Sequence, residues 1–376
     1  MTTRVLFAIH GPADPATAVF SNVMHRKECL EAAGCRVEVL TAEDLAVSWI
    51  PGRLNPLVLP LTLLGRSLAS YDAVIFHSYL GWAFYACRSL VDRARHPFTV
   101  TMFHGLEPTY HEAVAAELRR IGRPVSRRFR LLHHVIVRRL LKFACTRADA
   151  VFCLNTAEAA YLTSHRWVKA ERLHVVSNAV EETAIDDARE SRSGKRLVTV
   201  AQWMPVKGMR YLAEAFARIA RKDPAVTLTC AGTGVGIDQV LATFPEDVRP
   251  RVTVLPRLDR SGVFAELRRA DIFVLPSLFE GSSLALIEAL MAGLPVVCTR
   301  VGAAPDVLRD GVDAVLVPPA DAQALVTALE RLTADEQLRR TLGENARAVG
   351  ARFSWPAVCP GYRIHLLNLV KAHVQR

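Results

Sequence analysis

The sequence alternates short apolar runs, rich in β-branched and aromatic residues, with longer segments of helical spacing. In the first half of the chain, segments such as 17–33, 111–120 and 127–145 have helical spacing. The apolar runs between them are RVLFAI (4–9), RVEVLT (36–41), AVIFHS (73–78), FTVTMF (98–103), AVFCLN (150–155) and LHVVS (173–177). Strands that alternate with helices along a chain form a parallel, doubly wound sheet. We therefore expect an α/β fold.

This pattern stops in a polar stretch, VEETAIDDARESRSGKR (180–196), and then begins again. Such a segment without apolar periodicity is typical of a linker between domains. We expect a Rossmann-like domain at 1–178, a linker at 179–195 and a second such domain at 196–354. Helical spacing in the second half covers 208–221, 261–269 and residues from 321 onward. The apolar runs there are LVTVAQ (197–202), VTLTCAG (226–232), RVTVLP (251–256), Ile272 to Leu275, Val296 to Cys298 and AVLVP (314–318).

Composition allows a large core and favours an anionic partner. The chain has 376 residues, of which 51% are hydrophobic and 22% charged, and its formal net charge is +10. This balance argues against global disorder. The positive charge suits a nucleotide, a phospholipid surface, a polyprenyl phosphate or a nucleic acid, and charge alone does not choose among them. No zinc, helix-turn-helix or aromatic-basic strand signature is present, so we expect no nucleic-acid partner.

The eight cysteines show neither C-x-x-C nor zinc-ligand spacing. Several lie inside apolar runs, so we expect buried free thiols in a reducing cytoplasm. The opening RVLFAIH is typical of a strand rather than a signal peptide. No apolar run reaches the roughly 18–20 residues of a spanning helix. The cysteines are Cys29, Cys35, Cys87, Cys145, Cys153, Cys230, Cys298 and Cys359.

The most informative segment is DIFVLPSLFEGSSLALIEALMAGLPVV (271–297), which predicts a strand, a loop, a helix and a second strand. The helix LALIEALMA is apolar on every side except at Glu288, and a helix that is apolar all round is buried. A buried carboxylate is costly unless it is paired or hydrogen-bonded, so Glu288 needs a partner. Ser282 and Ser283 are natural N-cap residues, and backbone N–H groups beside Glu280 would favour an anion.

Glu280 and Glu288 form E-x7-E, preceded by LPS and followed by AGLPVV. With these flanks the segment resembles the signature of the retaining glycosyltransferases of family 4, which have the GT-B fold. The resemblance implies two Rossmann-like domains that face one another across a cleft. It also implies a closing helix, at about 355–376, that returns to the first domain. The alternative is that Glu288 pairs with a core arginine and Glu280 is a solvated loop charge.

A second segment, VAQWMPVKGMRYL (200–212), is similar to the family pattern V-G-R-L-x-x-x-K-G. Lys207 and Gly208 match this pattern, and a lysine before a helix N-terminus is well placed to hold a diphosphate. Ala201 and Gln202 stand where the family has glycine and arginine, so Gln202 supplies no charge there. Without the family context, Lys207 would be a solvated charge that flanks a helix.

The first half matches the family more loosely. FHGLE (103–107) resembles the family's H-G motif, which places His104 near the reacting sugar, and the alternative is a strand-end histidine with a structural hydrogen bond. Gly11 lies in the loop after the first strand, which otherwise keeps little of the family's glycine-rich loop. His10 lies in the same loop, and His77 and Ser78, after the third strand, are weaker candidates.

The resemblance extends to AGTGVG (231–236), near the nucleotide, and to LPRLDR (255–260), near its base. Pro256 stands where the family usually has a glycine, so the sequence does not predict which nucleotide base is bound. The implied catalytic residues are His104, Lys207 and Glu280. The implied donor-binding residues are Gly11, Gln202, Gly232, Gly234, Arg257, Gly281, Ser282, Ser283, Leu284 and Glu288.

The resemblance implies transfer of a sugar from a nucleotide-sugar donor to a hydroxyl of a glycan or lipid-linked saccharide, with the anomeric configuration kept. Lys207 and helix amides would stabilise charge growing on the diphosphate, while Glu280 holds sugar hydroxyls and Glu288 holds the ribose. No D-x-D is present, so we expect no metal ion at the diphosphate. We also expect no cofactor, because the nucleotide sugar is a substrate. The alternatives are an epimerase or a glycosyl phosphorylase of the same fold, or a non-catalytic nucleotide-sugar-binding protein.

Residues 119–147 interleave basic and apolar side chains. A basic amphipathic helix can lie on an anionic membrane surface, which would make the protein peripheral at the inner face of the plasma membrane. The alternative is an ordinary helix whose arginines lie in water. The segment LNPLVLPLTLLG (54–65) would add an apolar patch, although its prolines favour a loop into a core helix. The basic residues are Arg119, Arg120, Arg123, Arg127, Arg128, Arg130, Arg138, Arg139, Lys142 and Arg147.

Overall fold

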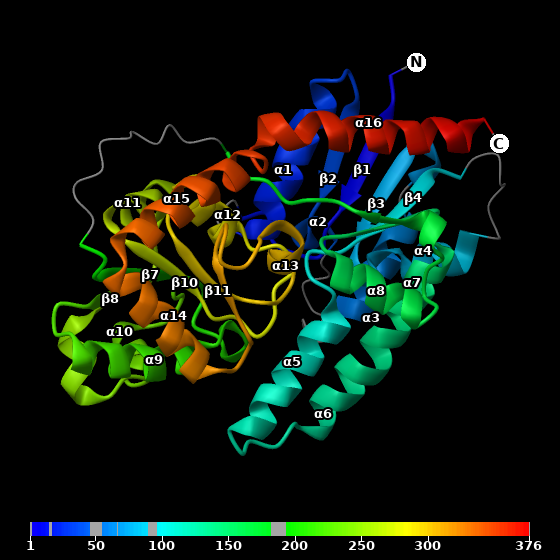
Figure 1. Cartoon of the computed structure of the whole chain (residues 1–376). Helices are drawn as coiled ribbons and strands as arrows, with labels where there is room; N and C mark the ends of the chain where they lie inside the picture. Colours follow the sequence, from blue (N-terminus) through cyan, green and yellow to red (C-terminus); the bar gives the residue numbers. More distant parts are fainter. Residues whose placement is uncertain are drawn as a thin grey trace. The chain divides into compact units, whose positions relative to one another are not determined.

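The computed structural model describes residues 2–14, 17–45, 55–65, 67–88, 96–181 and 193–375. It divides into two compact units, each built around one six-stranded sheet (Figure 1). Unit 1 comprises Met1–His111, Val125–Asn178 and Trp355–Arg376, and unit 2 comprises Glu112–Pro124 and Ala179–Ser354. No helix in the described ranges is both long and apolar enough to cross a membrane.

The sheet of unit 1 is parallel, with the strand order β2-β1-β3-β4-β5-β6. All residues of β3 and β4 are buried, as in the middle of a parallel sheet with both faces covered. The strands are β1 (Arg4–Ala8), β2 (Arg36–Leu40), β3 (Ala73–His77), β4 (Phe98–Met102), β5 (Ala150–Cys153) and β6 (Leu173–Val175). The α-helices of this unit are α1 (Ala18–Glu31), α2 (Ala42–Leu45), α3 (Asn55–Thr62), α4 (Trp82–Cys87), α6 (Arg127–Phe129), α7 (Arg138–Arg147), α8 (Thr156–Ser164) and α16 (Trp355–Val374). The helix α5 (Glu107–Arg120) begins in unit 1, and its residues from Glu112 onward belong to unit 2.

Two hydrophobic cores cover the two faces of this sheet. Because successive side chains of a strand point to opposite faces, Val5 and Phe7 of β1 belong to one core and Leu6 and Ala8 to the other. The first core is completed by α1 and by α16, whose Leu366 is fully buried. The second is completed by side chains of α3, α4, α7 and α8. The closing helix therefore packs on the sheet of unit 1.

The expectation that all cysteines are free was wrong for two of them. Cys29 of α1 and Cys359 of α16 form a disulfide, with their Cα atoms 5.8 Å apart. The two residues are 330 positions apart in sequence, so spacing gave no sign of the pairing. They meet because α16 returns to lie against α1 (Figure 1). Cys35, Cys145, Cys153, Cys230 and Cys298 are free and buried, as expected, and Cys87 is free and half-buried.

The sheet of unit 2 is also parallel, with the strand order β12-β11-β10-β7-β8-β9. One face packs against α9 and α14, and the other against α11, α12 and α15. The strands are β7 (Arg196–Val200), β8 (Thr227–Ala231), β9 (Val252–Leu255), β10 (Ile272–Leu275), β11 (Val296–Thr299) and β12 (Val315–Val317). The helices are α9 (Met209–Lys222), α10 (Ile237–Leu241), α11 (Arg260–Arg269), α12 (Leu284–Met291), α13 (Ala304–Val307), α14 (Ala322–Ala334) and α15 (Glu336–Ala351).

Each apolar run named from the sequence overlaps one strand, and the predicted α/β class is confirmed. The helices α2, α4, α8, α10 and α13 were not predicted. Within the proline-containing segment 54–65, Asn55–Thr62 forms α3 despite Pro60, followed by a 3-10 turn at Leu63–Gly65. In this segment Leu59 and Leu63 are buried, whereas Leu61 and Leu64 are exposed. Of the predicted linker, residues 182–192 lie outside the described residues.

Candidate active site

In unit 2 the strand order reverses between β7 and β10, which are neighbours in the sheet although β8 and β9 separate them in sequence. Open parallel sheets bind ligands outside the carboxyl ends of their strands at such a switch point. Lys207 lies in the connection that follows β7, and Glu280 lies in the loop that follows β10. The fold therefore brings these two predicted residues to the same edge of one sheet.

Lys207 and Glu280 form an ion pair in which Nζ lies 2.7 Å from Oε1. The same Oε1 accepts a hydrogen bond from Ser277 Oγ at 2.6 Å. The two charged side chains are only 25% and 10% exposed. An attraction between charges is stronger there than in bulk water, because the local dielectric constant is lower. This edge of the sheet thus holds a cation and a carboxylate in direct contact.

Close backbone packing fixes the position of Lys207. Gly208, the next residue, has φ +69°, and a Cβ atom there would lie 1.9 Å from the carbonyl oxygen of Pro276. The amide of Leu278 donates to the carbonyl of Val206 at 2.7 Å. These contacts join the connections after β7 and β10. Only glycine fits this approach, because any side chain would meet the backbone and would also disfavour the left-handed conformation.

The loop of Glu280 leads into α12. Ser283 is the N-cap of this helix, and its side chain accepts a hydrogen bond from the amide of Leu286 at 3.3 Å, which confirms the predicted cap. The carbonyl of Gly281 accepts from the amide of Ala303 at 2.9 Å. Ser282 and Leu284, also predicted for the donor, are partly buried beside the cap. The helix start is therefore anchored from the neighbouring loop after β11.

Glu288 lies in the middle of α12, and its carboxyl makes no hydrogen bond or ion pair with the residues that the structure describes. Burial raises the pKa of its carboxyl to about 7, and the positive charge of Arg260 offsets this only in part. Arg260 is itself paired with Glu181, at 2.8 Å. The alternative in which Glu288 pairs with a core arginine is therefore not what the structure has. The carboxyl can accept hydrogen bonds from hydroxyl groups of a ligand.

Four further residues predicted for the donor follow β7, β8 and β9. The amide of Gly234 donates to the carbonyl of Pro256 at 3.0 Å, and that of Gly232 donates to the carbonyl of Leu255 at 2.8 Å, so the loops after β8 and β9 are joined. Gly232 and Gly234 have φ +66° and +70°, which explains the glycines. Gln202 lies in the loop after β7, and its side chain is close to Gly234: a Cβ at Gly234 would lie 3.9 Å from Cγ of Gln202. Arg257 is exposed.

In unit 1 the strand order reverses between β1 and β3. His10 and Gly11 follow β1, and His77 ends β3. The ring of His10 contacts that of Tyr79 in a tilted arrangement, with the centroids 5.3 Å apart and the planes at 37°. A Cβ on Gly11 would meet nothing within 4 Å, so packing does not require glycine at this position. His104 follows β4, the next strand in the sheet.

His104 makes a hydrogen bond with His77, with Nε2 and Nδ1 2.8 Å apart, and the two rings stack with their centroids 4.6 Å apart. Burial, with smaller contributions from neighbouring positive groups, lowers the pKa of His104 to about 3 and that of His77 well below its usual value. Both imidazoles are therefore neutral near pH 7. A neutral His104 can exchange hydrogen bonds with a sugar hydroxyl but brings no positive charge.

Known proteins resemble the chain over most of its length. A model described as Glycosyltransferase Family 4 matches residues 23–183, and one described as Glycosyl transferases group 1 matches residues 194–335. The chain is 29% identical over 325 residues to MMP alpha-(1->4)-mannosyltransferase of Mycolicibacterium hassiacum, which covers 84% of this chain and 76% of that protein. The chain belongs to the family 4 glycosyltransferases.

Solved structures show that the glycosyltransferase has the predicted GT-B fold. Sucrose-phosphate synthase of Thermosynechococcus elongatus matches with a TM-score of 0.75 at 22% identity, covering 98% of this chain and 100% of that one. HepE of Anabaena, in complex with UDP, matches with a TM-score of 0.69 at 18% identity, covering 97% and 100%. At these identities the likeness concerns the fold alone.

The glycosyltransferase has buried acidic residues in unit 1 that sequence reasoning missed. Glu158 is 3% exposed, and its two oxygens accept the amides of Leu106 and Leu154 at 2.9 Å, which joins the loops after β4 and β5. Glu107 accepts a hydrogen bond from Ser78, and burial raises its pKa to about 7. Ser78 has φ +58°, an unusual conformation for serine. Glu107 was visible in FHGLE, but only its burial marks it as unusual.

Proposed function

We propose that the protein is a retaining glycosyltransferase that moves a hexosyl or N-acetylhexosaminyl unit from a nucleotide sugar to a hydroxyl acceptor. The observation that carries the proposal is the ion pair of Lys207 and Glu280 at the switch point between β7 and β10. Charged groups at such an edge are suited to a ligand that has both phosphates and hydroxyls. A relative named as a mannosyltransferase and a fold shared with a UDP complex support this donor class.

Each side chain of the pair has a separate role in this proposal. Lys207 holds the diphosphate and stabilises the negative charge that grows on it as the glycosidic bond breaks. The amides at the start of α12 add a favourable dipole. Glu280 accepts hydrogen bonds from hydroxyls of the donor sugar, and Glu288 accepts from the ribose. Hydrogen bonds to the charged form of Glu288 would lower its raised pKa on binding.

The proposed reaction uses no cofactor, and the protein's own cation takes the place of a metal ion at the diphosphate. Lys207 lies 2.7 Å from Glu280, so its ammonium would exchange one anionic partner for another when the donor binds. In unit 1, His104 contributes hydrogen bonds to the reacting sugar as a neutral imidazole. The acceptor is a hydroxyl of a glycan or of a lipid-linked saccharide.

Binding of the donor is expected to raise the melting temperature. A ligand at about 100 times its Kd stabilises the native state by about 2.7 kcal/mol, which corresponds to roughly 5–10 °C for a unit of this size. Thermal-shift measurements with UDP-, GDP- and ADP-sugars would identify the base. Lys207→Met should remove most of the shift, whereas Lys222→Met, at a lysine that is 72% exposed in the same unit, should keep it. Absence of a shift with every nucleotide sugar would contradict the proposal.

We also propose that the basic region 119–147, of which residues 125–147 belong to unit 1, binds an anionic membrane surface and so brings the enzyme to a lipid-linked acceptor. Arg127, Arg128 and Arg130 are exposed in this region. Leu131 and Val135 are exposed beside them, by 59% and 37%, and both lie in the π-helix Arg130–Val137 that joins α6 to α7. Exposed apolar groups flanked by arginines suit a headgroup surface better than water alone.

Loss of the three arginines should release the protein from acidic vesicles. Each basic residue near such a surface contributes about 1 kcal/mol, so replacing Arg127, Arg128 and Arg130 by glutamine should weaken binding roughly a hundredfold. Co-sedimentation with phosphatidylserine vesicles measures this. The control variant replaces the exposed Arg218, Arg331 and Arg340 of unit 2 by glutamine, with the same loss of charge. Equal binding by the two variants would refute a specific membrane role of the region.

A further inference from the structure

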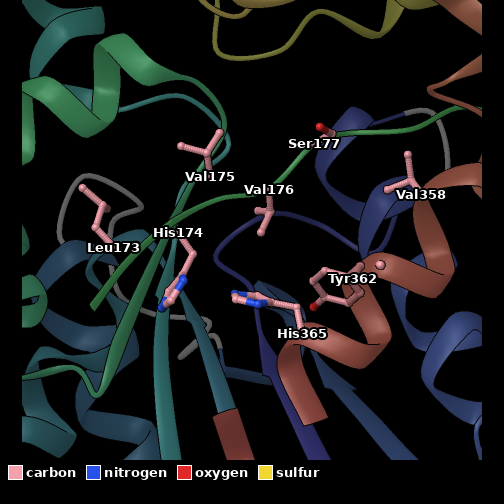
Figure 2. A pocket seen from close by; sticks show the side chains of 9 residues that line it. Leu173, His174, Val175, Val176, Ser177, Val358, Tyr362 and His365 are labelled. Atoms are coloured by element: carbon pink, nitrogen blue, oxygen red, sulfur yellow. The ribbon is translucent and has the colours of Figure 1, made fainter. Parts of the chain in front are cut away.

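Two histidines lie side by side in the lining of a pocket of about 520 Å³ in unit 1. His174 belongs to β6, the edge strand of the sheet, and His365 belongs to α16. Figure 2 shows the side chain of His365 extending from α16 toward the ring of His174, with Tyr362 beside His365. None of these residues belongs to the donor or acceptor residues described above. The pair is not part of the proposed donor site.

The spacing of the rings suits two ligands of one metal ion. Their centroids lie 4.6 Å apart and the ring planes make an angle of 65°. With a metal–nitrogen bond of about 2.0–2.1 Å, each centroid lies about 3.2 Å from the metal. Two such rings would have centroids about 4.5 Å apart at a right angle and about 5.2 Å apart at a tetrahedral angle. The observed separation falls in this range without movement of either backbone.

The surroundings hold both rings in place and leave a nitrogen available. Phe152 contacts both rings, with centroid distances of 5.6 Å to His174 and 5.9 Å to His365. Nε2 of His365 is buried and has no hydrogen-bond partner among the described residues. Tyr362 is engaged by Arg26, whose guanidinium lies 4.3 Å from its ring centroid, and is not counted as a ligand.

We propose that His174 and His365 bind a borderline divalent transition-metal ion such as Zn²⁺, Ni²⁺ or Cu²⁺, which ties the edge strand β6 to the closing helix α16. Imidazole nitrogen is a preferred ligand of these ions, whereas Mg²⁺ and Ca²⁺ prefer oxygen. No group of three or more histidine, cysteine, aspartate or glutamate side chains suited to a metal gathers in the described part of the chain. Water completes the coordination, for which the cavity has room.

Metal binding to the native state is expected to raise the melting temperature of the full-length protein. After removal of metals with EDTA and dialysis, Zn²⁺ or Ni²⁺ should raise the melting temperature by about 2 °C or more, and Mg²⁺ should not. His174→Ala and His365→Ala should each abolish the increase. His165→Ala, at an exposed histidine of unit 1, should retain it. No increase in the native protein, or an equal increase in all three variants, would overturn the proposal.

A spectroscopic measurement tests the site without depending on the folding of the variants. Electron paramagnetic resonance of the native protein with one equivalent of Cu²⁺ should show coupling to two imidazole nitrogens. A spectrum with oxygen ligands only, or one that His174→Gln and His365→Gln leave unchanged, would contradict the assignment. Neither readout uses sugar transfer, so failure of this inference and failure of the proposed reaction are separable.

Discussion

Glu280→Ala is expected to lower kcat for sugar transfer by about 10²–10³-fold. The variant removes the group proposed to hold the hydroxyls of the donor sugar. It also leaves Lys207 without the carboxylate that lies 2.7 Å from its Nζ, and Ser277 without its acceptor. The ammonium of Lys207 would then be free to move from the position in which it meets the diphosphate. Transfer of radiolabelled sugar to an added acceptor measures the loss.

The control for this prediction is Glu246→Ala, at a glutamate of unit 2 that is 88% exposed and lies outside the candidate site. It should keep full activity. Glu280→Gln keeps the size of the side chain but loses its charge, so it should lie between the native protein and Glu280→Ala. Melting temperatures of all three variants show whether each is folded. Full activity of a folded Glu280→Ala variant would refute the assignment of this residue.

Gly208→Ala is expected to destabilise unit 2 by about 2–4 kcal/mol and to lower its melting temperature by roughly 6–12 °C. The new Cβ would lie 1.9 Å from the carbonyl oxygen of Pro276, in a backbone conformation with φ +69° that disfavours alanine. Both effects act on the turn between Lys207 and α9. Thermal denaturation followed by circular dichroism measures the change.

Gly236→Ala is the matched control, because a Cβ at Gly236 would meet nothing within 4 Å and its φ is −63°. This variant should melt close to the native protein. If the two alanine variants melted at the same temperature, the close approach of Gly208 to Pro276 would not limit stability. The prediction also bears on activity, because a shift of this turn would move Lys207 away from Glu280.

Local pattern was enough to predict much of unit 2. The segment 271–297 combines a buried strand, a serine cap and an apolar helix, and each of these is fixed by residues close together in sequence. The structure accordingly has β10, the Ser283 cap and α12 where the pattern placed them. The same reasoning located Lys207 and Glu280 after their strands. Their direct contact depends on β7 and β10 being neighbours, which the alternation of strands and helices does not specify.

Unit 1 shows where local pattern is insufficient. The expectation of free thiols failed at Cys29 and Cys359 because only the return of α16 brings them together. Glu158 appears in the sequence as an ordinary helical glutamate, and its role depends on the amides of two loops that converge on it. In the segment 54–65 the prolines indicated a loop leading into a core helix, whereas the structure has a helix that runs through Pro60 and is held by the buried Leu59 and Leu63.

The sequence by itself determined the α/β class, the strands, the buried helix α12 and the family resemblance, because hydrophobic periodicity and short motifs are properties of neighbouring residues. Only the tertiary structure decided which strand ends are adjacent, which cysteines pair and which acids and histidines are buried with shifted pKa values. Those outcomes depend on contacts between residues far apart in the chain. The free energy of a charge or a thiol is set by what surrounds it in space.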